Sequence, residues 1–162
     1  MIRWLAILIV AMTLHADGPF AFDETRYVYS IDRTLELSGT IRFDASGMEI
    51  DYTAPEASRI VYDGERLRTY DGGGTLQHEI DLNDEPGMRL YMQFLLWLYR
   101  GDFEALGAYF TVTETPEGMR LDPIPPTDRV VTSVAVAGSA GAIRQIQTDM
   151  SNGDAITIRI SR

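Results

Sequence analysis

Few residues in this chain of 162 have the types and spacing that chemistry needs. His78 lies beside Glu79, but the chain has no cysteine and only one other histidine, His15, so no metal-ligand set can form around it. Glu49 and Asp51 lie two residues apart and share one face of a predicted strand. They form either an acid/base pair or, as their alternation with apolar neighbours favours, a solvated acidic surface. We therefore expect no enzyme activity, no metal and no cofactor.

The residue types and the net charge also give little reason to expect phosphate or nucleic-acid binding. The three glycines at 72–74 lack the lysine and the hydroxyl residue of a phosphate-binding loop, so they predict a turn. Arg66 and Arg68 share a strand face, as either an exposed polar surface or a phosphate clamp. The net charge of -10 argues against a nucleic-acid partner, because phosphate backbones attract basic surfaces. The absence of cysteine excludes disulfides and a lipid anchor attached through an N-terminal cysteine.

The N-terminal segment has the features of a secretory signal peptide. Arg3 precedes an uncharged apolar run over residues 4–14, which is shorter than the roughly 20 residues of a membrane span. Ala16 supplies the small residue after which cleavage is expected, and a second choice extends the range to Ala21. We expect a signal peptide at 1–16, a single mature domain at 17–162 and a periplasmic location. A retained N-terminal anchor is the alternative.

Hydrophobic periodicity predicts strands over most of the remaining chain. Residues alternate with a period of two from Arg26 onward, and turn signals such as Asp63-Gly64 and Asn152-Gly153 separate consecutive strands. The exception is a helix over residues 88–99, which has no internal glycine or proline and follows a helix-starting Pro86. The pattern predicts an α+β protein, mainly antiparallel β, in which each strand pairs with its neighbour in the sequence.

The predicted helix is apolar on almost every side. Its polar residues are Arg89, Gln93 and Arg100, which fall on one narrow stripe. A helix of this kind must be covered nearly all round, and a strongly curled sheet is the available cover. One short helix fills only part of the concave face of such a sheet. The interior is therefore either an ordinary dry core or a core that contains an apolar cavity.

Several short segments occur in the order found in LolA-like periplasmic lipoprotein carriers, and the chain resembles that family from about residue 27 to residue 160. The segments that carry the resemblance are Ser38-Gly39-Thr40-Ile41, residues 50–55, Val61-Tyr62-Asp63-Gly64 with Leu67 and Tyr70-Asp71, Leu95-Leu96, Phe110-Thr111-Val112, residues 118–123 and Asn152-Gly153-Asp154. The resemblance implies an unclosed half-barrel with a helical lid over an apolar cavity. It also implies a carrier that performs no chemistry.

Two features depart from the family pattern. Strand character begins at about Arg26, almost directly after the signal segment, so the family's N-terminal lid helix is missing and one helix is expected to form the lid. The family's Arg-Pro pair, whose arginine locks the lid, is replaced by Asp44-Ala45-Ser46. We interpret the chain as a divergent member, whose cargo is a lipoprotein or another lipid.

The resemblance implies a periplasmic chaperone that binds acyl chains of lipoproteins or other lipids and shuttles them from the inner to the outer membrane. The expected partners are the lipid cargo, an inner-membrane exporter as donor and an outer-membrane acceptor, and we expect a monomer. The candidate cavity residues are Phe43, Ile50, Tyr52, Tyr62, Leu95, Trp97 and Leu98. Two alternatives stay open: a protein-binding envelope adaptor or sensor of the same fold, and an enzyme of lipid or cell-wall metabolism that uses carboxylates such as Glu49 and Asp51.

Overall fold

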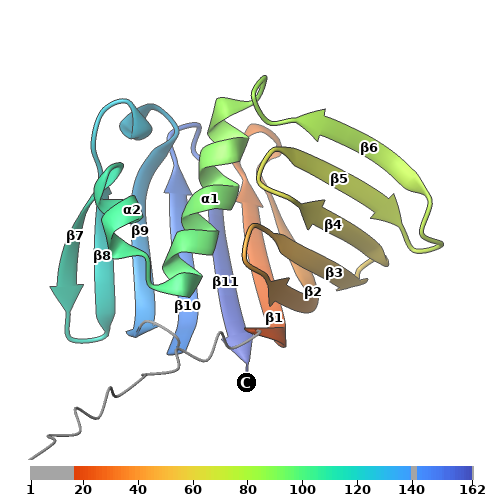
Figure 1. Cartoon of the computed structure of the whole chain (residues 1–162), viewed down its shortest axis with the longest axis horizontal. Coiled ribbons are helices and arrows are strands. Elements are labelled where there is room, and N and C mark those ends of the chain that lie inside the picture. Colours follow the sequence, from red (N-terminus) through yellow and green to blue (C-terminus); the bar gives the residue numbers. More distant parts are fainter. Residues whose placement is uncertain (1–16, 140–141, 162) are drawn as a thin grey trace, which may run out of the picture.

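An eleven-stranded antiparallel sheet makes up most of the structure (Figure 1). The computed structural model describes residues 17–139 and 142–161, so the expected signal peptide at 1–16 lies outside the described residues. The strands are β1 (Asp17–Val28), β2 (Arg33–Phe43), β3 (Met48–Ala54), β4 (Ser58–Tyr62), β5 (Arg66–Asp71), β6 (Leu76–Asp81), β7 (Phe110–Thr115), β8 (Gly118–Pro123), β9 (Val131–Ser139), β10 (Ala142–Met150) and β11 (Ala155–Ser161). Two helices complete it, α1 (Pro86–Arg100) and α2 (Phe103–Gly107), together with two short 3-10 turns.

The chain builds the sheet as two meanders that meet in the middle. From β1, strands β2 to β6 run outward to one edge; the chain then crosses the sheet as α1, and β7 to β11 return from the other edge. β11 pairs with β1, so that Ile158 lies opposite Glu24 and Ile160 lies opposite Phe22. Strands β6 and β7 stay at opposite edges, so the sheet is open. The expected α+β class and unclosed antiparallel sheet are confirmed.

The hairpin turns fall where the sequence predicts them. Asp63-Gly64 lies between β4 and β5, and Asn152-Gly153 lies between β10 and β11. The first turn is fixed by a carboxylate: Asp63 accepts hydrogen bonds from the backbone N–H groups of Glu65 and Arg66, at 2.9 and 2.7 Å. These bonds and the positive charge of Arg68 hold the pKa of Asp63 below its ordinary value, although partial burial works in the other direction.

β1 begins earlier than the sequence pattern predicts. The periodicity indicates strand character from about Arg26, whereas the strand starts at Asp17. Phe20 and Phe22 hold inward positions of the same alternation, but the next inward position is Glu24, whose charge interrupts the apolar pattern. The early strand therefore brings a carboxylate onto the inner face of the sheet.

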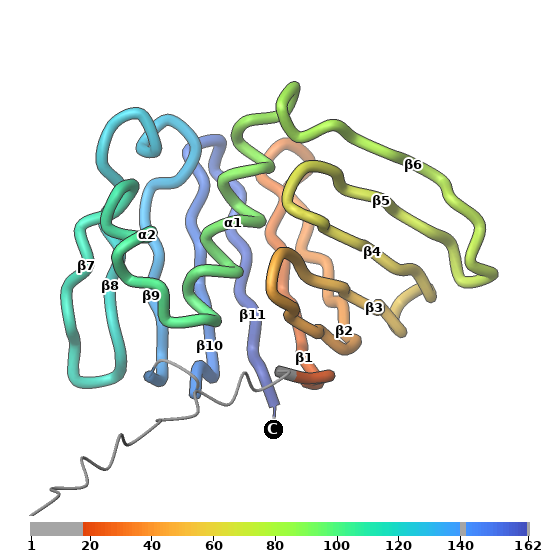
Figure 2. Tube along the Cα trace, in the orientation of Figure 1, coloured from red at the N-terminus to blue at the C-terminus, as the bar shows by residue number. Residues whose placement is uncertain are grey.

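Helix α1 crosses the concave face of the sheet (Figures 1 and 2). It starts two residues before the predicted range of 88–99, with Pro86 in its first turn, and it ends at Gly101, whose φ of 68° is the left-handed conformation that closes many helices. None of the residues 89–99 is exposed, so the prediction that the helix is covered nearly all round is confirmed. Among the described residues, no helix is long and apolar enough to cross a membrane.

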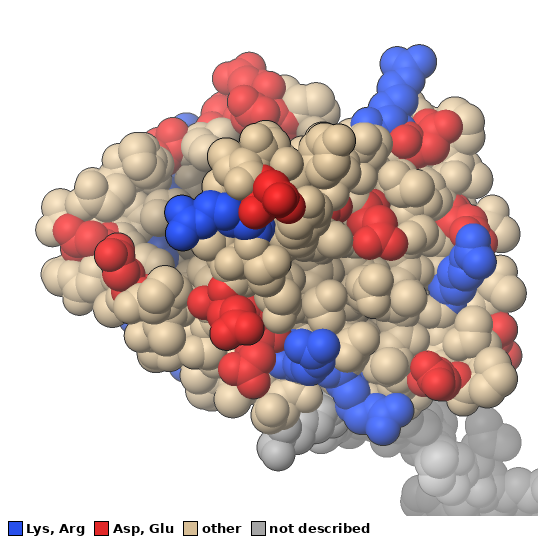
Figure 3. All heavy atoms as spheres, turned by 180° about the vertical axis from the view of Figure 1, so that it is seen from behind, with Lys and Arg blue, Asp and Glu red and all other residues tan. Residues whose placement is uncertain are grey.

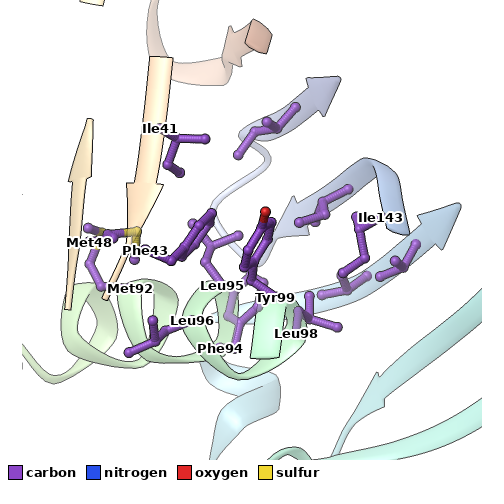
Figure 4. Close-up of a cluster of buried hydrophobic side chains, with 14 of the residues drawn as sticks. Ile41, Phe43, Met48, Met92, Phe94, Leu95, Leu96, Leu98, Tyr99 and Ile143 are labelled. Atoms are coloured by element: carbon purple, nitrogen blue, oxygen red, sulfur yellow. The ribbon is translucent and has the colours of Figure 1, made fainter. Parts of the chain in front are cut away.

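The C-terminal half of α1 packs into a solid apolar core (Figure 4). Phe43 of β2 stacks on Tyr99 of α1 with the ring centroids 3.7 Å apart. Phe94 meets Phe110 of β7 edge to face, with the centroids 5.8 Å apart, and Leu98 has no exposed surface. At this end of the helix the sheet and the helix leave little unfilled space between them.

One hydrogen bond ties the C-terminal end of α1 to the sheet. The guanidinium of Arg100 donates to the backbone carbonyl oxygen of Asp44, in the turn between β2 and β3. The last residue of α1 is therefore tied to the turn between β2 and β3.

The opposite face of the sheet is polar. Figure 3 shows this side of the molecule, with acidic and basic side chains interspersed across it. On β3, Glu49 and Asp51 lie 3.4 and 2.6 Å from the guanidinium of Arg59. The two carboxylates are therefore paired with a cation on an outer surface, in agreement with the polar-surface interpretation.

The arginines of β5 are paired in the same way. Arg66 and Arg68 lie 3.3 and 2.6 Å from the carboxylate of Glu79 on β6. His78, next to Glu79 in the chain, is exposed on the same edge strand. Because both guanidiniums already face a carboxylate, this surface favours the exposed polar face over the phosphate clamp.

Candidate ligand-binding site

A hollow of about 450 Å³ lies between the N-terminal half of α1 and the sheet. Most of its lining side chains are aliphatic: Ile41, Ile50, Ile60, Leu67, Met88, Met92, Leu95, Val130, Met150, Ile156 and Ile158. The volume lies toward the lower end of the range of about 300–1,000 Å³ in which proteins bind single small molecules. The hollow therefore has the size and the composition for one apolar ligand.

An ion pair lies in the wall of this hollow. The Nε and Nη2 atoms of Arg26 donate hydrogen bonds to Oε1 of Glu24 at 2.9 and 2.5 Å, and the hydroxyl of Tyr52 donates to Oε2 at 3.1 Å. Glu24 is 4% exposed and is the one fully buried charged residue in the described part of the chain. The side chain of Arg26 is 39% exposed and lines the hollow.

The alternation along β1 places this pair among apolar side chains. Phe22, Glu24 and Arg26 are spaced two apart and so point to the same face of the sheet. The strand register puts Leu37 of β2 and Ile158 of β11 directly beside Glu24. A carboxylate in such a setting costs free energy unless it is paired and hydrogen-bonded, which explains its three short contacts.

Tyr52 reaches the pair because a glycine lies in the strand between them. In the register of the sheet, Phe22 of β1 lies opposite Gly39 of β2, and Gly39 lies opposite Tyr52 of β3. The rings of Phe22 and Tyr52 therefore meet across β2, edge to face, with the centroids 5.6 Å apart. A Cβ atom at position 39 would lie 2.0 Å from the carbonyl oxygen of Asp51, so any other residue would displace β3.

Burial and the charge of Glu24 control the ionisation of the groups around the hollow. Burial raises the pKa of the Tyr52 hydroxyl well above its ordinary value, and the negative charge of Glu24 raises it further. The pKa of Tyr91, on α1, is raised for the same two reasons. Burial lowers the pKa of Arg26, but the charge of Glu24 and the hydrogen bonds between them outweigh this, so the net shift is upward. Both tyrosines therefore keep their protons as hydrogen-bond donors, and Arg26 keeps its charge.

Three of the seven residues predicted for the cavity line the hollow, namely Ile50, Tyr52 and Leu95. The other four lie elsewhere. Tyr62 and Leu98 are buried in the core, and Phe43 belongs to the stacked pair at the solid end of α1. Trp97 lies in a separate surface hollow, stacked on Tyr109 with the centroids 5.4 Å apart. A ligand contact by any of the seven stays a prediction.

Glu24, Arg26 and Tyr91 line the hollow but are not among the residues predicted from the sequence. The signal that could have found the first two is the alternation of Phe20 and Phe22 with Glu24 and Arg26, two charges at positions where the pattern demands apolar side chains. Tyr91 carried no such signal, because an aromatic residue on an apolar helix is ordinary core.

Larger hollows on the surface are weaker candidates. One of about 710 Å³ lies on the outer side of the sheet near Arg59 and the glycines at 72–74, and another of about 710 Å³ runs beside Trp97. Neither is lined by a buried charged residue. Within residues 17–139 and 142–161, no three histidine, aspartate or glutamate side chains converge as metal ligands.

No protein-family model matches the chain, and no curated protein matches its sequence. The resemblance to the LolA-like carriers therefore stays a prediction that its sequence motifs carry. The hollow under α1 and the ion pair in its wall are the features from which a function is proposed.

Proposed function

We propose that this protein is a periplasmic carrier that binds an acyl chain of a lipoprotein or another lipid in the hollow under α1 and shuttles it from the inner to the outer membrane. The observation that supports this most is the hollow itself, about 450 Å³ of mostly aliphatic wall inside an open, curved sheet. In this proposal α1 is the lid, and residues 1–16 are the signal that exports the chain.

The energetics of an acyl chain explain what such a carrier needs. Burying one methylene contributes about 0.8 kcal/mol, so a chain of about sixteen carbons gains on the order of 12 kcal/mol relative to water. The same chain gains almost nothing relative to a bilayer, because both surroundings are apolar. The carrier therefore shields its cargo in transit, and it needs an inner-membrane exporter to load it and an outer-membrane acceptor to unload it.

The two ends of α1 suggest how the lid works. The C-terminal half is held by the stacked Phe43 and Tyr99 rings and by the hydrogen bond from Arg100 to Asp44. The N-terminal half borders the hollow, and Met88 there is 39% exposed. The N-terminal half is therefore the part that moves to admit a chain, while the C-terminal half stays packed.

Native mass spectrometry of protein purified from the cell envelope tests the carrier directly. We expect a bound species with the mass of a lipid, and consistently ligand-free protein would contradict the proposal. Met88→Glu places a charge at the rim of the hollow and should reduce the lipid-bound fraction. Leu76→Glu makes the same kind of change at a residue 49% exposed on the edge strand β6, away from the hollow, and should leave the bound fraction unchanged.

One observation favours the alternative of a protein-binding adaptor. Tyr29 and Ile31, in the short turn between β1 and β2, are 63% and 57% exposed. Exposed apolar side chains at a tip are a common feature of protein contacts. An adaptor would be ligand-free in the mass spectrum and would lose its partner on Tyr29→Ser and Ile31→Ser, whereas a carrier would keep its lipid in both variants.

A further inference from the structure

The ion pair in the wall of the hollow carries an inference about the cargo. We propose that the hollow takes a single-chain lipid whose headgroup is uncharged and accepts hydrogen bonds, such as an ester of glycerol, with that headgroup at Glu24 and Arg26. This inference rests on the proposed carrier function and narrows its substrate class. Contacts, space and charge each support one part of it.

The space available limits the cargo to one chain. A volume of about 450 Å³ lies toward the lower end of what proteins use for one small molecule. The hollow is enclosed on the sheet side by buried residues such as Ile41 and Ile50, which are 5% and 8% exposed. Cargo with several acyl chains would have to leave all but one of them outside this space.

The contacts of Arg26 point to a headgroup that accepts hydrogen bonds. A guanidinium has five N–H donors; Arg26 uses two on Glu24 and one on the Tyr52 hydroxyl, which leaves further donors. Its side chain is 39% exposed and lines the hollow, where a headgroup would meet it. Tyr91, which also lines the hollow, keeps its proton and adds a hydroxyl donor from the helix side. The carboxylate of Glu24 already accepts three hydrogen bonds.

The charges favour a headgroup that is itself neutral. Glu24 and Arg26 together sum to zero, and the wall around them is aliphatic. An anionic headgroup on Arg26 would lie close to the buried Glu24 and leave an unbalanced negative charge in apolar surroundings, which is costly. A cationic headgroup would meet Arg26 with the same cost. An ester carbonyl or a hydroxyl satisfies the donors without disturbing this balance.

Three probes with the same sixteen-carbon chain test the inference on the full mature protein. They are monopalmitoylglycerol, palmitate and hexadecyltrimethylammonium, which are neutral, anionic and cationic. Each is titrated by displacement of a fluorescent lipid at about pH 8, below its aggregation concentration. We expect the neutral probe to bind about tenfold more tightly than either charged probe.

Glu24→Gln makes the decisive variant. It removes the negative charge while keeping the shape of the side chain, so Arg26 is left as a net positive charge and palmitate should become the tightest of the three probes. In the double variant E24Q/R26Q the wall is neutral again, so monopalmitoylglycerol should again bind more tightly than the two charged probes. Arg59→Gln is the matched control, because Arg59 is also paired with a carboxylate but lies on the outer face; it should keep the wild-type order.

The outcomes separate the two proposals. If none of the probes binds the wild-type protein, the carrier function itself fails. If the probes bind but with equal affinity, or if Glu24→Gln leaves their order unchanged, the carrier stands and the headgroup inference is overturned. Circular dichroism of each variant checks its folding, and should Glu24→Gln not fold, the order of the three probes on the wild-type protein is the test.

Discussion

The two halves of α1 pack against the same sheet in opposite ways. At the C-terminal half, Phe43 and Tyr99 stack at 3.7 Å and Leu98 is fully buried, so helix and sheet fill the space between them. At the N-terminal half, a hollow of about 450 Å³ separates them, and its wall contains the Glu24–Arg26 ion pair. One half of the helix is built like the core of an ordinary protein and the other half is not.

This difference separates the packing that stabilises the fold from features that its stability does not require. Protein interiors are normally packed as tightly as organic crystals, and unfilled apolar space lowers stability. A buried ion pair in an apolar wall is also a weak source of stability, since apolar residues of similar size often stabilise a protein as much or more. The solid half is therefore packed as stability requires, whereas the hollow half carries features that stability does not require.

The largest expected effect compares two leucines one turn apart on α1. Leu98→Ala removes a fully buried side chain from the solid half and should lower the free energy of unfolding by about 3–5 kcal/mol. Leu95→Ala removes a side chain that already lines the hollow, so fewer packing contacts are lost and we expect about 2 kcal/mol. Urea denaturation measures both. Equal losses would show that α1 packs as tightly beside the hollow, where Leu95 lies, as it does at Leu98.

The second effect concerns the ion pair. Arg26→Met leaves the carboxylate of Glu24 buried without its cation, and we expect a loss of about 2 kcal/mol, below the range for fully buried pairs because Arg26 is partly exposed. The double variant E24L/R26M replaces both charges with apolar groups and should unfold at about the wild-type denaturant concentration or higher. A double variant less stable than Arg26→Met would mean that the pair is needed for folding.

A third effect appears at alkaline pH. Burial and Glu24 raise the pKa of Tyr52 and Tyr91 above the value of about 10 in the unfolded chain, so the folded state holds these protons more tightly. Their contribution to stability is complete below about pH 10 and is lost as the pH rises further, by up to about 1.4 kcal/mol per pH unit for each tyrosine. Tyr91→Phe should flatten this decline in denaturation curves measured at several pH values. An unchanged slope would place Tyr91 in solvent.

The smallest effect is at the solid end. Arg100→Met removes the hydrogen bond to the carbonyl oxygen of Asp44 but leaves no buried charge, because Arg100 is exposed. We expect a loss of about 0.5–1 kcal/mol, clearly less than for the same substitution at Arg26. Hydrogen exchange of the last turn of α1 should also become faster. A loss as large as that of Arg26→Met would remove the distinction between the two arginines.

Much of the fold follows from local patterns in the sequence. Strong conformational preferences of the residues predict two turns and one helix. These are the turns at Asp63-Gly64 and Asn152-Gly153 and the helix around 88–99. The start of β1 is not predicted in this way, because Glu24 holds an inward position that the periodicity assigns to apolar residues. The pairing of β1 with β11 joins distant parts of the chain and has no local signal.

The candidate site is less predictable than the fold for the same reason. Tyr52 meets Glu24 only because the register places Gly39 between them, and register is set by the whole sheet. The division of α1 into a solid half and a hollow half is equally invisible in a helix that is apolar throughout. The sequence therefore predicts Leu95 and Leu98 equally as cavity residues. Only the three-dimensional packing shows that Leu95 lines the hollow and that Leu98 lies in the solid core.

Filling the hollow tests most directly whether it is the ligand site. Ile156 of β11 lies opposite Arg26 and lines the hollow, so Ile156→Trp should occupy the space that an acyl chain would take. We predict that the variant binds monopalmitoylglycerol at least about tenfold more weakly, while its free energy of unfolding is unchanged or higher because a cavity has been filled. Undiminished lipid binding by a folded Ile156→Trp protein would contradict the assignment of the hollow as the ligand site.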